Sequence, residues 1–261
     1  MLIEAYILCW NEEKILPFTL EHYSSFCDRI LLLDNHSTDR SLEIAEQFPK
    51  VQVIQWNARE GENIYDERSN VVMKNWAYEQ HGVGADWVCV VDCDELVYHP
   101  NIREKLEEYM YAGITLPRTA GYEMISDAFP VLGTPLTEQI TSGIFDQGMC
   151  KRLVFDPRIG LKYACGSHYS SSEVAFATVD GEGEPPPYHS TLTPKESEDV
   201  EIKVLHYKDL SAPYKIERLK MLSARMSEWC LETETSGHWL QTEEQILSYF
   251  KERLPLAEDV I

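Results

Sequence analysis

The sequence lacks the basic excess, the long apolar runs and the paired cysteines that mark several classes of protein. Only 23 of its 261 residues are Lys or Arg, against 44 Asp and Glu, and the formal net charge is −21. A general nucleic-acid-binding protein needs a basic face for the phosphates, so we do not expect that function. The same acidic balance opposes strong attraction to anionic membranes.

No apolar run is long enough to span a bilayer, and the N-terminal stretch MLIEAYILCW is too short and too acidic for a signal peptide. None of the seven cysteines lies in a CxxC pair, and several lie inside apolar runs. This pattern favours buried thiols in a reduced protein over a disulfide framework or a zinc site. We therefore expect a cytoplasmic protein without a transmembrane segment, and peripheral contact with the inner face of the membrane stays open.

Apolar runs alternate with helical patterns through the first hundred residues. The expected strands are residues 2–10, 29–35, 51–56 and 86–91, and the expected helices are residues 16–27, 37–48 and 68–80. Strands that are continuously apolar and separated by helices predict a mostly parallel sheet with helices on both faces. The expected fold class is therefore α/β and Rossmann-like.

The second half of the chain has a looser pattern. Its expected features are irregular binding loops over 118–150, strands at 151–157, 161–169 and 202–207, a Pro-rich acidic excursion over 180–201, and helices at 212–232 and 242–254. The last helix has the Thr242/Gln245 spacing of a capping box. With no internal repeat and no convincing linker, residues 1–261 are expected to form a single domain.

Polar residues follow three of the expected strands at the point where each strand ends. The first strand runs into CWNEE, the second into DNHSTD and the fourth into DCDE. Because the carboxyl ends of parallel strands meet at one edge of a sheet, these residues should converge on one crevice. Asp92 and Asp94 point the same way in extended chain, with Cα atoms about 6–7 Å apart. Their oxygens suit Mg²⁺ or Mn²⁺, although acids after a strand also serve as helix caps or exposed turn residues.

Each remaining candidate has both a functional and a structural interpretation. Asp34 either caps the next helix or hydrogen-bonds a base or ribose, and Asn11 and Glu13 either border the same nucleotide or form an acidic turn. Arg68 either pairs with a diphosphate or forms a surface salt bridge. The remaining pair, His168 and His206, lies at or near strand ends, where a histidine either completes a metal shell or is a core residue.

The motifs of the first hundred residues resemble a known enzyme family. The segments YILCWNEE, LPFTLEHY and ILLLDNHSTDRS, followed by ADWVCVVDCDELV, resemble the family-two glycosyltransferases with the GT-A fold. Those enzymes have a strand ending in Asn-Glu, an Asp-Asn-x-Ser-Thr-Asp element after the second strand and a D-x-D after the fourth. Beyond Tyr98 the likeness is thin, although VLHYKDLS is similar to a subset that has a late histidine.

The resemblance implies a donor site and a reaction. It implies transfer of a sugar from a nucleotide-diphosphate sugar to a hydroxyl acceptor, a glycan or lipid-linked glycan as in polysaccharide biosynthesis, with Mn²⁺ or Mg²⁺ and usually with inversion. Residues 1–100 would bind the nucleotide sugar, 101–210 the acceptor, and 211–261 would form C-terminal helices. The implied roles are base contact for Asp34, base or phosphate contact for Arg68, ribose or water-mediated metal contact for Asp92, and metal binding for Asp94 and for His206, with His168 as the second choice.

Inversion also requires a carboxylate that removes the proton of the acceptor. We favour Asp127, because ISDAF places one acid among apolar residues where its pKa would rise, and Asp146 is the second choice. Two other functions were weighed. A sugar-phosphate nucleotidyltransferase needs a Gly-rich basic loop after the first strand, which LCWNEEKIL lacks. A non-catalytic carbohydrate-binding relative would be favoured by the loss of Asp94, which is present.

Overall fold

Four parallel strands form the centre of the first sheet in the computed structural model, which describes residues 1–167 and 191–261. The strands are β1 (Ile3–Cys9), β2 (Arg29–Asp34), β3 (Val51–Gln55) and β4 (Trp87–Asp92), in the order β3-β2-β1-β4-β8, with β8 (Val154–Phe155) antiparallel to β4. The connecting helices are α1 (Leu16–Phe26), α2 (Ser41–Ala45) and α3 (Glu67–His81). The predicted parallel α/β architecture is confirmed.

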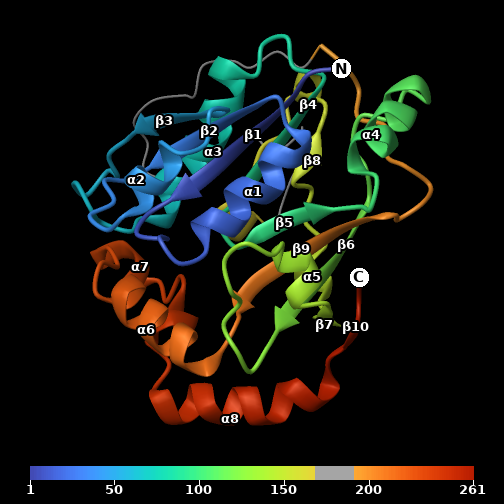
Figure 1. Ribbon diagram of the computed structural model, residues 1–261. Helices are drawn as coiled ribbons and strands as arrows, with labels where there is room; N and C mark the ends of the chain where they lie inside the picture. The colour runs from blue at the N-terminus through green and yellow to red at the C-terminus, as the bar shows by residue number, and fades with distance from the viewer. Residues whose placement is uncertain (168–190) are drawn as a thin grey trace.

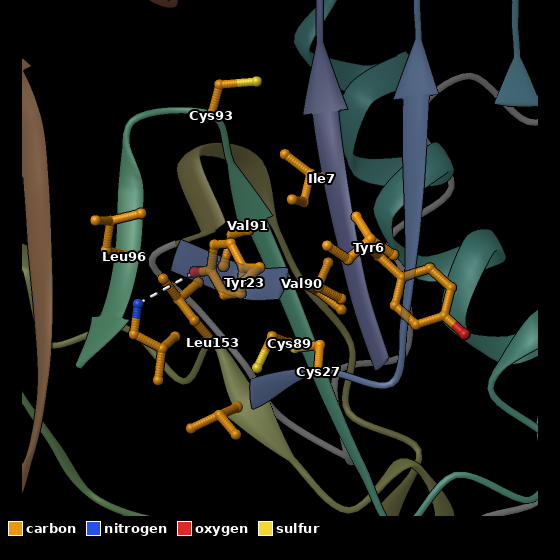
Figure 2. Packing of buried hydrophobic residues seen from close by; sticks show 14 of the residues in the cluster. Tyr6, Ile7, Tyr23, Cys27, Cys89, Val90, Val91, Cys93, Leu96 and Leu153 are labelled. Atoms are coloured by element: carbon orange, nitrogen blue, oxygen red, sulfur yellow. Dashed lines mark hydrogen bonds between the residues drawn. The ribbon is translucent and has the colours of Figure 1, made fainter. Parts of the chain in front are cut away.

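Helices cover both faces of this sheet, as Figure 1 shows. The connections through α1 and α2 lead the chain one way along the sheet, and α3 leads it back past β1, so right-handed crossovers place α3 on the opposite face. As a result, β1 and β2 are almost entirely buried, whereas the edge strand β3 is partly exposed. Figure 2 shows Tyr23 of α1 within the same buried cluster as Val91 and Leu96.

The second sheet is mostly antiparallel, in the order β10-β7-β6-β9-β5. Its strands are β5 (Glu95–Tyr98), β6 (Thr119–Ile125), β7 (Ser142–Phe145), β9 (Ile202–Asp209) and β10 (Glu258–Asp259). The expectation of irregular loops over 118–150 is therefore wrong, because the segment holds β6, the short helix α5 (Leu136–Gln139) and β7. Strand β6 pairs with β9 about eighty residues further along the chain, and local patterning does not report such a partner.

The D-x-D segment is the link between the two sheets. Strand β4 ends at Asp92 and β5 begins at Glu95, so Cys93 and Asp94 form the turn between them. Register places Asp92 level with Leu8, and Asp34 level with Cys9. The predicted convergence of three strand ends on one edge of the sheet is thus confirmed.

Helices close the chain as predicted, with one difference. The helical elements of the second half include α4 (Ile102–Tyr111), α6 (Ala212–Ser223), α7 (Glu228–Glu232), η4 (Gly237–Leu240), α8 (Glu243–Arg253) and η5 (Leu254–Leu256). The single helix expected over 212–232 is broken between α6 and α7, where the Ser227 side chain accepts a hydrogen bond from Cys230 N and starts a new helix. The predicted capping box of Thr242 and Gln245 is present at α8.

Two further expectations need correction. The helix expected over 37–48 is shortened to α2, because residues 37–39 are held in a turn by Asn11. The strand expected over 161–169 is not formed in its described part, which ends in a 3₁₀ turn (η3, Cys165–Ser167) where Gly166 has φ 72°. Half of the acidic excursion expected over 180–201, residues 180–190, lies outside the described residues.

Candidate active site

A cavity of about 690 Å³ lies at the carboxyl ends of the parallel strands. Its volume is within the range of small-molecule sites, and its position is where α/β sheets bind ligands. The wall is built from the ends of β1 and β2, the β4–β5 turn, the second sheet and the C-terminal helices. Among the described residues, six Lys and Arg side chains line it despite the net charge of −21: Lys74, Lys151, Lys208, Lys215, Arg218 and Arg225.

Asp94 lies at the centre of this cavity and is buried. One of its carboxylate oxygens, Oδ2, lies 2.7 Å from Arg218 Nη1 and 3.5 Å from His206 Nε2. Although burial opposes the shift, Arg218 and His206 hold the pKa of Asp94 well below its usual range. Asp94 is therefore a fixed negative charge.

His206 has a carboxylate on each side of its ring. Its Nδ1 lies 3.2 Å from Glu123 Oε2, while Nε2 faces Asp94. Sheet register produces this arrangement, because His206 of β9 pairs with Glu123 of β6 on one side and with Glu95 of β5 on the other. Burial opposes the charged ring, but Glu123 and Asp94 raise the pKa of His206 to about 9. Glu123 also accepts a hydrogen bond of 2.6 Å from Lys208 Nζ.

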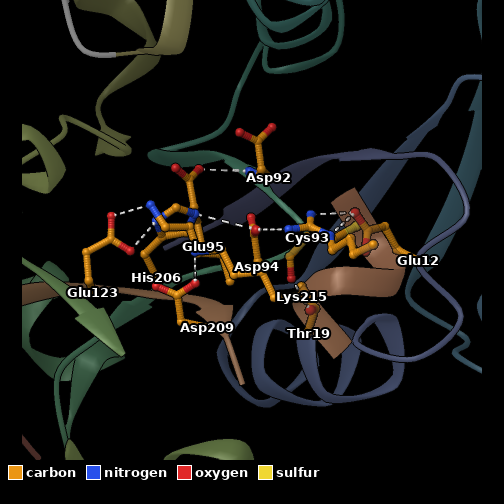
Figure 3. Close-up of polar contacts among 12 residues, drawn as sticks. Glu12, Thr19, Asp92, Cys93, Asp94, Glu95, Glu123, His206, Asp209 and Lys215 are labelled. Carbon is orange, nitrogen blue, oxygen red and sulfur yellow. Dashed lines mark hydrogen bonds and ion pairs between the residues drawn. The ribbon is translucent and has the colours of Figure 1, made fainter. Parts of the chain in front are cut away.

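Arg218 continues the row on the other side of Asp94. Its Nη2 and Nε donate to Glu12 Oε1 over 2.6 and 3.2 Å. Burial raises the pKa of Glu12 to about 7, against the opposing effect of Arg218. Figure 3 shows Glu12, Asp94, His206 and Glu123 in one row across the cavity, with cationic groups alternating with acids.

Asp92 occupies a different part of the wall. Its side chain is 41% exposed and pairs with Lys74 of α3 over 2.8 Å. Lys74 Nζ also donates to Ser167 Oγ over 2.8 Å. Glu95, the first residue of β5, accepts a hydrogen bond of 2.9 Å from Asp92 N and forms an ion pair of 2.6 Å with Lys151. The Asp92 side chain is thus accessible to a ligand, while the Glu95 carboxylate holds the Asp92 backbone in place.

Aromatic and amide groups line the end of the cavity near β1 and β2. The Arg225 guanidinium lies 3.9 Å from the centre of the Trp10 ring, and Arg225 also donates to Asn35. The Asn35 amide donates to the Trp56 carbonyl over 3.0 Å. A planar ring and amide groups at a sheet edge suit a nucleobase.

Four residues predicted to touch the nucleotide are engaged elsewhere. Asp34 is fully buried and accepts hydrogen bonds of 3.2 Å from Ser37 N, in the turn before α2, so it does not cap that helix. Both Asn11 and Glu13 tie the end of β1 to the turn before α2. The guanidinium of Arg68 pairs with Asp66 and Glu60, each over 2.8 Å. None of the four is among the residues that line the large cavity in the described parts of the chain.

The two candidate bases differ in position. Asp127 is exposed and lies outside the residues that line the cavity, so the expectation that apolar neighbours bury it is wrong. The turn after β6 carries it into solvent. Asp146 does line the cavity, where its side chain accepts a hydrogen bond from Gly148 N over 2.8 Å. His168 lies outside the described residues.

Arg218 was not predicted as a site residue from the sequence, and no specific role was predicted for Glu12. Arg218 lies between Ile216 and Leu219, the apolar stripe of α6, and a cation beside such a stripe is ordinarily solvated. Only the packing of α6 against the strand ends shows that it faces two buried acids. The His206–Glu123 pair was equally out of reach, because it depends on the register of β6 and β9.

Within residues 1–167 and 191–261, no group of three or more His, Cys, Asp or Glu side chains is placed to hold a metal ion. Asp94 Oδ2 and His206 Nε2 nevertheless face one another, and the Glu123 carboxylate lies against Nδ1, the position that carboxylates take beside metal-binding histidines. Mg²⁺ and Mn²⁺ sites often use one or two protein ligands and complete the shell with water and substrate phosphates. The residues therefore fit a divalent ion that is shared with a ligand.

Comparison with known proteins supports the resemblance drawn from the motifs. Residues 5–65 match the family described as glycosyl transferase family 2. That segment contains β1, α1, β2 and β3, the strand ends of which border the cavity. This segment is therefore similar to the family-two glycosyltransferases. No curated protein matches the chain.

Solved structures include distant neighbours of the whole chain. Staphylococcus aureus TarS 1–349 has a TM-score of 0.42 and 10% identity, over 86% of this chain and 65% of that chain. The longer S. aureus TarS structure has a TM-score of 0.41 and 13% identity, over 97% of this chain and 43% of that chain. The chain thus spans less than two thirds of either TarS structure. Among the helices of the described residues, none has the length and apolarity that a bilayer crossing requires.

Proposed function

We propose that this protein is a glycosyltransferase that moves a sugar from a nucleotide-diphosphate sugar to a hydroxyl of a carbohydrate or lipid-linked acceptor. The observation that carries the proposal is the cavity at the strand ends, where Asp94 and His206 face one another among cationic side chains. A family-two match over residues 5–65 supports it, since that segment supplies one wall of the cavity.

In this proposal Asp94 and His206 hold Mn²⁺ or Mg²⁺, with Asp92 nearby as an exposed carboxylate. A bound divalent cation supplies electrostatic stabilisation for the charge that develops on a departing diphosphate. Glu123 keeps the imidazole of His206 oriented, and metal binding requires the ring to lose its Nε2 proton. Lys74 and Arg218 bring positive charge to the same wall and favour an anionic ligand.

The nucleobase is proposed to lie against Trp10 and near Asn35, at the ends of β1 and β2. The acceptor then enters from the side of the second sheet and C-terminal helices, which Trp239 and Tyr249 line. Asp146 stands on that side and is the candidate that removes the proton of the acceptor hydroxyl, with inversion at the anomeric carbon. Asp127 is not retained in this role because it lies outside the cavity.

Thermal unfolding tests the donor site directly. We expect one of UDP, GDP and dTDP to raise the melting temperature in the presence of Mn²⁺. At a ligand concentration of one hundred times Kd the stabilisation is about 2.7 kcal/mol, which for a chain of this size is about 5–10 °C. Asp94→Asn should lose the Mn²⁺-dependent part of the shift, whereas Asp127→Asn, a matched change of an exposed acid, should keep all of it. Equal shifts in Asp94→Asn and wild type would contradict the metal role.

Product analysis tests the transfer itself. With a matching nucleotide sugar and acceptor, NMR should show a product of opposite anomeric configuration to the donor. Asp146→Asn should keep the nucleotide-induced shift and lose at least about 10²-fold in kcat, because general base catalysis contributes that much. A retained configuration, or full activity in Asp146→Asn, would exclude the inverting mechanism through this residue.

A further inference from the structure

Arg218 occupies the position on Asp94 that a metal ion would need. The oxygen that faces His206 Nε2 is Oδ2, and the same oxygen accepts the 2.7 Å hydrogen bond from Arg218 Nη1. The guanidinium also binds Glu12 through two nitrogens, so it spans two carboxylates. The Arg218 side chain is only 14% exposed, and the two acids are 10% and 6% exposed. This is a buried, two-sided ion pair and not a surface contact.

We propose that Arg218 is a placeholder cation, which holds Asp94 until a divalent ion arrives together with a nucleoside diphosphate. The guanidinium neutralises Asp94 while the cavity holds no ligand, and it excludes a metal ion that arrives alone. This inference deepens the proposed function and rests on it for the identity of the ligand. Arg218 is a positioning residue in this proposal, since it acts through Asp94.

Repulsion is the physical reason that the metal alone binds weakly. A divalent ion that reaches Asp94 Oδ2 meets the Arg218 guanidinium, which already binds that oxygen. Lys208 lies behind Glu123 and adds a second positive charge to the same row. Like charges in a site of low polarity repel one another strongly. A guanidinium that is displaced from Asp94 keeps only its ion pair with Glu12 among its two carboxylate partners.

A nucleoside diphosphate changes this balance. Its phosphate oxygens bring negative charge to the metal, and a guanidinium that leaves Asp94 can form paired hydrogen bonds with a phosphate. The arginine therefore keeps two anionic partners in both states, Glu12 with Asp94 in the first and Glu12 with phosphate in the second. Metal and diphosphate then bind with positive coupling, which by linkage is the same whichever arrives first.

Titration of Mn²⁺, followed by electron paramagnetic resonance or calorimetry, tests the placeholder role. In wild type we expect weak Mn²⁺ binding that tightens about tenfold or more, at least about 1.4 kcal/mol, when a nucleoside diphosphate (UDP, GDP or dTDP) is present. Arg218→Met should bind Mn²⁺ without nucleotide about tenfold more tightly than wild type, and nucleotide should add little. The readout is metal affinity, so no turnover is needed.

Two controls separate occupancy of Asp94 from the general field. Lys208→Met removes an equal charge that pairs with Glu123 and not with Asp94, and should tighten Mn²⁺ by less than about threefold. Arg40→Met removes an exposed charge that pairs with Glu43, and should change nothing. Where Arg218→Met fails to fold, because two buried acids lose their partner, the double variant with Glu12→Gln removes one of them and is measured instead.

Each outcome decides the inference. Mn²⁺ affinity in Arg218→Met no greater than in wild type overturns it, as does an equal gain in Lys208→Met. Tight Mn²⁺ binding by wild type without nucleotide also overturns it. If Arg218→Met gains Mn²⁺ affinity but no nucleotide binds wild type, the placeholder role of Arg218 stands and the proposed glycosyltransferase function fails.

Discussion

The buried ion pair beneath the D-x-D turn gives the sharpest stability prediction. Lys151 Nζ lies 2.6 Å from Glu95 Oε1, and the side chains are 7% and 1% exposed. The other oxygen of Glu95 accepts the backbone N–H of Asp92 over 2.9 Å. Lys151→Met keeps most of the side-chain volume and removes the charge. It leaves a buried carboxylate whose nearest partner has gone.

The magnitude follows from the geometry. Two unit charges 2.6 Å apart attract by about 6 kcal/mol at the effective dielectric constant of about 20 that suits protein sites. Part of this is offset by the desolvation of both groups, and the loss of one partner of a buried pair commonly costs about 3–5 kcal/mol. Lys74 also acts on Glu95 and softens the loss. We therefore expect Lys151→Met to lower the free energy of unfolding by about 3 kcal/mol at pH 7.

The pH dependence has a definite sign. Against the effect of burial, Lys151 and Lys74 hold the pKa of Glu95 below its usual value of 4.5. A carboxylate with a lowered folded-state pKa stabilises the fold above its unfolded pKa, and this stability is lost as the pH falls towards the folded pKa. In Lys151→Met, Glu95 takes up a proton more readily and its burial then costs less. The difference between variant and wild type should therefore shrink from pH 7 to pH 4.

Urea unfolding, followed by circular dichroism at pH 7 and pH 4, measures both effects. Lys220→Met is the matched control, because Lys220 and Glu243 form an ion pair in which the side chains are 66% and 60% exposed. It should change the free energy of unfolding by no more than about 0.5 kcal/mol. A loss below about 1 kcal/mol in Lys151→Met at pH 7, or a difference that grows on acidification, would refute the reasoning.

Three further changes have expected outcomes. Burial lowers the pKa of His22, which binds the Val97 carbonyl, from 6.5 to about 4, so stability present above pH 6.5 is lost as the pH falls towards 4. By linkage, the free energy of unfolding measured in urea should fall by about 2 kcal/mol between pH 7 and pH 5. His22→Gln should remove this pH dependence, and an unchanged pH dependence would exclude His22 as its source. In Gly121→Ala the new Cβ would clash with the Met149 carbonyl group, so thermal unfolding should show a destabilisation of about 3 kcal/mol. A loss under about 1 kcal/mol would show that the backbone around Met149 can move to accommodate the methyl group. Thr242→Ala removes the capping box of α8 and should cost about 1 kcal/mol by urea unfolding, whereas Thr242→Ser should cost little; equal losses would argue against the cap.

Local patterning was enough for the parallel α/β half of the fold, residues 1–100. Continuous apolar runs such as β4 can be satisfied only inside a sheet covered on both faces, and the helical spacing between them supplies the cover. The ends of β1, β2 and β4 then had to meet at one edge, because parallel strands share their direction. For the same reason Asp92 and Asp94 could be placed in the cavity from the sequence.

The sequence placed Arg68 and Asp127 less well, because the same side chain can have several different partners in a folded protein. Arg68 was a candidate for a phosphate, and in the structure Asp66 and Glu60 hold it. Asp127 was expected to be buried, but both Asp127 and the next residue, Ala128, are exposed in the bend after β6. The sequence does not show which partner Arg68 takes or whether Asp127 is buried, because either outcome is compatible with the neighbouring residues.

The sequence by itself determined the parallel α/β half, the edge of the sheet at which the cavity lies and the acids that line it there, because these follow from periodicity and strand direction. Only the tertiary structure decided which charges face one another. The Asp94–Arg218 contact joins a turn to a helix more than one hundred residues away, and the His206–Glu123 contact depends on strand register. Such contacts are set by long-range packing, and the free energy that selects them comes from the whole fold and not from any local segment.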